Sequence, residues 1–128
     1  MRTKPSLDLA DAEAMSAACL TAAQAAGAPV TIAVVDEAGG LLTLHRRDGA
    51  RAYSVDLATR KARTAAAVGV STSVIAERAK GPMAGDFLPA PGGLPVLSQG
   101  QCAGAVGVSG ASPEVDEQIA AAGVAALP

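Results

Sequence analysis

Lys61 is the residue of this sequence whose type and position most directly suggest chemistry. It falls on one face of a predicted helix, together with the mostly apolar side chains of Tyr53, Leu57, Thr64 and Val68. A lysine on such a face must reach solvent, pair with a carboxylate or line a cavity. We expect the carboxylate to be Asp36 or an acid of a partner subunit. Lys61 then has two possible roles: a structural ion pair at a subunit interface, or an anion-binding or acid–base group in a pocket.

Three other polar side chains are candidates for proton transfer. His45 is the only histidine, and it is either a haem ligand, a proton shuttle or a half-exposed strand residue. Asp36 and Asp56 either cap turns or act as general bases. A nucleophile assisted by His45 has candidates in Ser98, Ser109 and Cys102, but no spacing in the sequence places them beside it.

A long segment rich in glycine and proline, Lys80–Gly93, is a candidate lid or pocket wall, because irregular loops of this length are uncommon unless they are functional or disordered. At its end, Gly92-Gly93 either presents backbone N–H groups to a carboxylate or enolate, or makes a tight turn with positive φ. Leu94 and Pro95 follow directly and would border the same ligand.

Tyr53 and Phe87 are the only aromatic residues, so they are the only side chains able to stack on a flat ligand. Leu88, Leu94 and Met83 could add apolar surface to such a site. This scarcity argues against haem, whose sites are usually lined by more apolar bulk.

Composition excludes several classes of protein. The net charge is −2 and the basic residues are dispersed, which argues against nucleic-acid binding. No apolar run is long enough to cross a bilayer. The two cysteines have no CxxC spacing and the N-terminus is charged, so we expect reduced thiols, no secretory signal and a cytoplasmic location. The length predicts a single domain, 1–128, and the alanine-rich core favours a homo-oligomer.

Hydrophobic periodicity and turn residues predict eight elements in the order α-β-β-α-α-β-β-α. Their expected bounds are helices at 9–26, 52–68, 71 or 72–79 and from 112–113 onward, with strands at 30–36, 41–46, 94–97 and 101–109. Hairpins rather than crossover connections predict an α+β sandwich with a mainly antiparallel sheet. The glycines of the last strand, Gly104, Gly107 and Gly110, indicate close approach of another backbone or a ligand.

Seven short motifs, spread along nearly the whole chain, resemble in type and order those of the GlcG/HbpS-like family, also called the haem-degrading domain family. Among them are Lys61-Ala62-Arg63-Thr64-Ala65, Gly92-Gly93-x-Pro95 and the run Gly104–Gly110. The resemblance implies a profilin-like sandwich, a central antiparallel sheet flanked by helices. It also implies homo-oligomers, from dimers to octamers, and haem or a corrinoid as the ligand of some members. It favours a pocket region around the motif that contains Lys61 and Thr64.

Two functions compete on these grounds. In the first, the chain is a small-molecule-binding protein, with haem or a related tetrapyrrole held near a subunit interface by Tyr53, Thr64, Phe87 and the residues 92–95. In the second, it is a metal-free, cofactor-independent isomerase or tautomerase. There Lys61 and the Gly92-Gly93 amides hold a carboxylate, while Asp36, Asp56 or His45 moves the proton.

Overall fold

The computed structural model describes residues 1–78 and 87–128. The elements follow the predicted order α-β-β-α-α-β-β-α, which confirms the α+β class. Their bounds are α1 Leu9–Ala25, β1 Thr31–Asp36, β2 Leu41–Arg46, α2 Tyr53–Val68, α3 Thr72–Arg78, β3 Gly93–Ser98, β4 Gln101–Ser109 and α4 Pro113–Ala125. The expected end of α3 at Ala79 and the loop positions 80–86 lie outside the described residues.

The four strands form one antiparallel sheet in the order β2-β1-β4-β3. β1 and β4 are central, and each hairpin adds one edge strand. In the register of β1 with its neighbours, Ile32 lies opposite His45 on β2 and opposite Val108 on β4. Asp36, at the other end of β1, lies opposite Gly104. This register sets which side chains share an end of the sheet.

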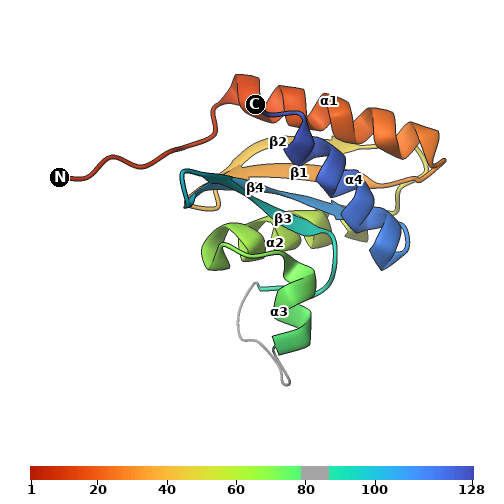
Figure 1. Ribbon diagram of the computed structural model, residues 1–128. Coiled ribbons are helices and arrows are strands. Elements are labelled where there is room, and N and C mark those ends of the chain that lie inside the picture. Colours follow the sequence, from red (N-terminus) through yellow and green to blue (C-terminus); the bar gives the residue numbers. More distant parts are fainter. Residues whose placement is uncertain (79–86) are drawn as a thin grey trace.

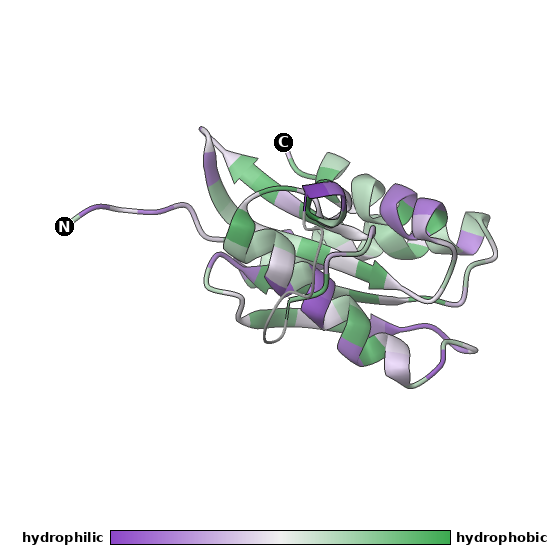
Figure 2. Cartoon of the chain, turned by 90° about the horizontal axis from the view of Figure 1, so that it is seen from below, coloured by the Kyte–Doolittle hydropathy of each residue, from purple (hydrophilic) through white to green (hydrophobic). Residues whose placement is uncertain are grey.

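Helices cover both faces of the sheet (Figure 1). α1 and α4 pack together on one face, over a core that contains Met15, Ile32 and Ile119. α2 covers the other face, where the core consists mainly of alanine and valine. Strongly apolar residues lie on the strands and also on the helices, where they alternate with weakly apolar and polar residues (Figure 2). Small side chains therefore set the distance between α2 and the sheet.

Local sequence signals begin and end these helices as expected. Asp8 and Asp11 form a capping box at the start of α1, and Ser112 accepts a hydrogen bond from the Val115 amide at the start of α4. Gly69 ends α2 in the left-handed conformation, with φ of 78°. The buried face of α2 differs from the predicted one: Tyr53 and Val68 are exposed. The buried residues of α2 are instead Ser54, Ala58, Lys61, Ala62, Thr64, Ala65 and Ala66.

The two cysteines occupy different environments. Cys19 is fully buried between α1 and α4, and its Sγ donates to the carbonyl of Ile119 at 3.3 Å. Burial raises the pKa of this thiol to about 12, because the thiolate would be desolvated. Cys102, on β4, is partly exposed. The cysteines thus differ in the two properties, thiolate formation and access, that control thiol reactivity.

We therefore expect one thiol per folded chain to react with Ellman's reagent at pH 8, and both to react in urea. A Cys102→Ser variant should show no rapid reaction until it is unfolded. Rapid reaction of that variant in native buffer would contradict the buried position of Cys19. The time course of absorbance at constant temperature measures both outcomes.

Candidate functional site

Lys61 and Asp116 form a buried ion pair inside the chain. The side chains of these residues are 6% and 4% exposed, and Lys61 Nζ lies 3.2 Å from Asp116 Oδ2. Nζ also donates to the carbonyl of Val108 at 2.9 Å. The second oxygen of Asp116 accepts from the Ala111 amide at 2.9 Å. Both charged groups therefore have specific partners, and the pair joins α2 to α4 across the end of β4.

The backbone around this pair explains Gly92. Val108 donates its N–H to the Gly92 carbonyl, and Gly92 has a φ of +124°. A Cβ atom on Gly92 would lie 2.5 Å from the Val108 oxygen and 2.9 Å from Lys61 Nζ. Glycine is thus required here by conformation and by the ammonium group that lies against it. The positive φ expected for a tight turn is present at Gly92, and the role proposed for its amide stays a prediction.

Gly93 likewise serves the packing of the chain. Its N–H donates to Thr72 Oγ1 at 2.9 Å, and a Cβ atom would lie 2.5 Å from the Lys61 carbonyl oxygen. The amide that the sequence offered for a substrate oxyanion is therefore already bonded within the chain. Leu94 packs against the core on the α1 side, and Pro95 is paired opposite Ala105 in the sheet. Residues 93–95 therefore form the start of the edge strand β3 and make packing contacts within the chain.

The prediction that Lys61 pairs with Asp36 or with an acid of a partner subunit was wrong, because Lys61 pairs with Asp116 of its own chain. Asp36 instead accepts the amides of Ala38 at 3.0 Å and Gly40 at 2.8 Å through Oδ1, so it caps the β1–β2 turn. The true partner, Asp116, belongs to the acidic first turn of α4, where the sequence suggested only a favourable helix dipole. Its spacing from the buried Ile119, Ala120 and Gly123 is the signal that could have revealed it. Burial is the largest influence on Asp116 and raises the pKa of its carboxyl, while the Ala111 amide and Lys61 oppose that rise.

The other two candidates for proton transfer lie elsewhere. The Asp56 side chain is 76% exposed and lies 3.9 Å from Arg60, one helical turn further on. His45 is opposite Ile32 on the α1 side of the edge strand β2, and its Nδ1 is buried without a hydrogen-bond partner among the described residues. Lys61, Asp36, Asp56 and His45 are therefore not brought together. Ser98 and Cys102 lie beyond Asp36 in the register, at the opposite end of the sheet from His45.

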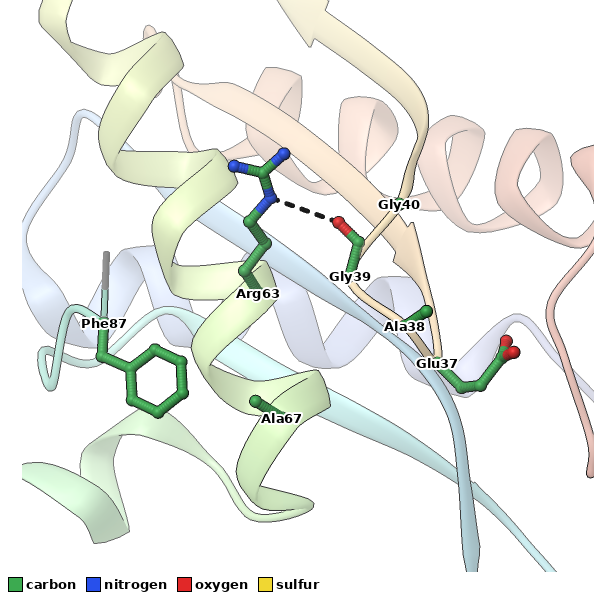
Figure 3. Close-up of a pocket in the computed structure, with 7 residues that line it drawn as sticks. All are labelled: Glu37, Ala38, Gly39, Gly40, Arg63, Ala67 and Phe87. Atoms are coloured by element: carbon green, nitrogen blue, oxygen red, sulfur yellow. Dashed lines mark hydrogen bonds between the residues drawn. The ribbon is translucent and has the colours of Figure 1, made fainter. Parts of the chain in front are cut away.

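A surface cavity of about 570 Å³ lies at the Asp36 end of the sheet. Its wall is made by the β1–β2 turn, the outer side of α2 and Phe87, with the lining residues Glu37, Ala38, Gly39, Gly40, Arg63, Ala67 and Phe87. The turn and the phenyl ring flank α2, with Arg63 and Ala67 between them (Figure 3). The size lies within the usual range for small-molecule sites. We take this cavity as the candidate site because of its volume and because Arg63 and Phe87 both line it.

Arg63 supplies the positive charge of the cavity. Its Nε donates to the Gly39 carbonyl at 3.2 Å, which aims the guanidinium along the β1–β2 turn (Figure 3). The Glu37 carboxylate points away from Arg63 and accepts from the Ser6 hydroxyl at 2.5 Å. The two terminal nitrogens of Arg63 have no partner among the described residues. A guanidinium with free, planar donors suits a carboxylate or phosphate ligand.

Only one of the predicted ligand-binding residues, Phe87, lines this cavity. Tyr53 is 58% exposed at the start of α2, beyond the cavity wall. Thr64 is fully buried and bonded to the backbone, so it cannot contact a ligand directly. Arg63 belongs to the same motif as Lys61 and Thr64, but it was not among the residues predicted from the sequence to form the site. Met83 lies outside the described residues.

Metal and membrane sites are not evident in the described parts of the chain. No group of three or more His, Cys, Asp or Glu side chains within residues 1–78 and 87–128 is arranged to hold a metal ion. No helix of these segments combines the length and the apolar character needed to cross a bilayer. The chemistry available at the cavity is therefore that of an arginine, a carboxylate, a phenyl ring and turn amides.

Comparison with known proteins gives consistent results. The family model described as "Haem degrading protein HbpS-like" matches residues 7–125. Protein GlcG of Escherichia coli K12 is 38% identical over 115 residues, which are 85% of this chain and 85% of that protein. A double mutant of Streptomyces reticuli HbpS superposes with a TM-score of 0.94 at 38% identity, covering 100% of this chain and 91% of that one. A PduOC:heme complex gives 0.88 at 28% identity, with 95% of each chain covered.

Proposed function

This chain belongs to the HbpS-like family, and on that premise we propose that it binds a planar, carboxylated small molecule of the tetrapyrrole class in the cavity beside Arg63. The observation that carries the proposal is the guanidinium of Arg63, which donates through Nε to Gly39 while its two terminal nitrogens have no partner among residues 1–78 and 87–128. A relative of the same fold is a haem complex, which supports the choice of ligand class.

The cavity suits the periphery of such a ligand. Arg63 would take a propionate in two parallel hydrogen bonds, and the Phe87 ring and the Ala67 methyl would cover part of the macrocycle. Among residues 1–78 and 87–128, those that line the cavity include no histidine, cysteine, methionine or tyrosine to ligate iron. His45 lies on the other side of the sheet and about four strand residues, or ~13 Å, from the β1–β2 turn. We therefore assign His45 no axial role within its own chain.

The proposal is tested by titrating the protein with hemin and following the Soret band. Arg63→Ala should weaken binding by about tenfold or more, because it removes a charge-assisted contact of at least ~1.4 kcal/mol. Arg63→Lys should lie between the wild type and Arg63→Ala, since an ammonium lacks the planar pair of donors.

Two matched variants serve as controls for this titration. Arg51→Ala removes an exposed arginine of the loop before α2, outside the cavity, and should leave the affinity unchanged. His45→Ala should also bind hemin like the wild type. The proposal is wrong if the wild type shows no saturable Soret change, or if Arg63→Ala binds as tightly as Arg51→Ala.

The described residues do not bring the predicted isomerase groups together, because the lysine is bonded to Asp116 and the other acids and bases are dispersed. The homo-oligomer and the cytoplasmic location expected from the sequence stay predictions. The exposed apolar side chains on the edge strand β2, Leu41 and Leu44, are compatible with a subunit contact.

A further inference from the structure

We propose that Thr64 is a positioning residue that places the Phe87 ring in the cavity without touching the ligand. This inference rests on the proposed function, because it concerns the wall of the same site. Thr64 belongs to the motif that also supplies Arg63, yet its side chain is fully buried and is not among the residues that line this cavity.

The hydrogen bonds of Thr64 connect its buried side chain to the cavity wall. Its Oγ1 donates to the Arg60 carbonyl, one turn earlier in α2, at 2.7 Å. The first bond fixes the rotamer of the hydroxyl, so that its lone pair faces out of the helix. The same oxygen accepts the N–H of Leu88 at 2.8 Å. Leu88 directly follows Phe87, so this bond ties the backbone that carries the ring to the helix that carries Arg63. A longer contact of 3.5 Å joins a terminal nitrogen of Arg60 in the same helix to the Phe87 carbonyl.

A second anchor lies further along the same segment. Thr72, at the start of α3, donates to the Ala90 carbonyl and accepts the Gly93 amide. Residues 88–93 are thus held at two points by two buried threonine hydroxyls. Thr72 holds the end nearer the sheet, whereas Thr64 holds the end nearer the cavity. Loss of the Thr64 bond should therefore affect the ring more than the fold.

The composition of the chain allows a direct test in the ligand-free protein. Phe87 is the only phenylalanine, so labelling with 4-fluorophenylalanine gives a single fluorine signal that reports on this ring alone. Thr64→Val removes the hydroxyl and keeps the shape, whereas Thr64→Ser keeps the hydroxyl. We expect Thr64→Val to shift or broaden the signal, and Thr64→Ser to reproduce the wild-type signal. An unchanged signal in folded Thr64→Val would overturn the inference.

Hemin titration gives an independent measure of the same effect. Thr64→Val should weaken binding by about threefold or more, and should add no further loss in a Phe87→Ala background, because the two residues then act as one unit. Additive losses, or a lower melting temperature with unchanged affinity, would show that Thr64 is only structural and would overturn the inference. If hemin does not bind, the proposed function fails, while the fluorine signal still decides the role of Thr64.

Discussion

Replacing Lys61 by methionine is expected to lower the free energy of unfolding by about 3–5 kcal/mol, which is the usual loss when one partner of a buried ion pair is removed. The Lys61→Met chain would retain the Asp116 carboxylate at 3% residue exposure, without its cation and with only backbone partners. For a single small domain with a total stability of about 5–15 kcal/mol, this is a large fraction. Urea unfolding followed by circular dichroism measures it, since the chain contains no tryptophan.

A neighbouring residue of the same helix provides the matched control. Arg63→Met makes a similar change of side chain two positions further on, at an exposed site, and should change stability by about 0.5 kcal/mol or less. Lys61→Met combined with Asp116→Leu should recover much of the loss, because an apolar pair of similar volume needs no charge compensation. Equal stability of Lys61→Met and Arg63→Met would refute the buried pair as we describe it.

The second large effect is expected at Gly107, where α2 touches the sheet backbone to backbone. A Cβ atom on Gly107 would lie 2.0 Å from the Ala58 carbonyl oxygen and 2.6 Å from the Ala62 nitrogen. Neither atom can move without displacing the helix from β4, so Gly107→Ala should cost about 3 kcal/mol, at the upper end of overpacking losses. Thermal unfolding should then show a melting temperature lower by roughly 10 °C or more.

Gly100 is a suitable comparison for Gly107. It has a φ of 78° in the β3–β4 turn, and a Cβ atom there meets nothing within 4 Å. Gly100→Ala should therefore cost only the strain of a left-handed residue, about 1–2 kcal/mol. The reverse order of the two losses would mean that α2 does not pack on β4 at the distance observed.

The glycines of the C-terminal third show how far the sequence could be interpreted. Their pattern on the strand 101–109 indicated close approach by another backbone or by a ligand, and the structure identifies the backbone of α2 at Gly107. For Gly92-Gly93 the turn and the oxyanion site were both open. Gly92 has the positive φ of such a turn, and the Gly93 amide is bonded to Thr72 within the chain. Local sequence indicated that bulk was excluded, but the excluding atoms come from distant segments.

The sequence by itself determined the order of the elements, their bounds to within one or two residues at most ends, and the α+β class. These properties follow from interactions between residues a few positions apart, such as the Asp8–Asp11 capping box, the glycine turns and the period of apolar residues. The family could be recognised for the same reason, because its motifs lie in these short segments.

Only the tertiary structure decided which polar groups meet. Lys61 and Asp116 are 55 positions apart on helices that cover opposite faces of the sheet. They meet beside Val108, just before the first residue of the edge strand β3. The cavity likewise combines Gly39, Arg63 and Phe87 from three segments. Such contacts depend on how helices cross a twisted sheet, which the periodicity of each segment does not encode. Sequence patterns could place Lys61 on a buried face, but only the packed fold showed that Lys61 is paired inside the chain while Arg63, two positions further on, lines the surface cavity.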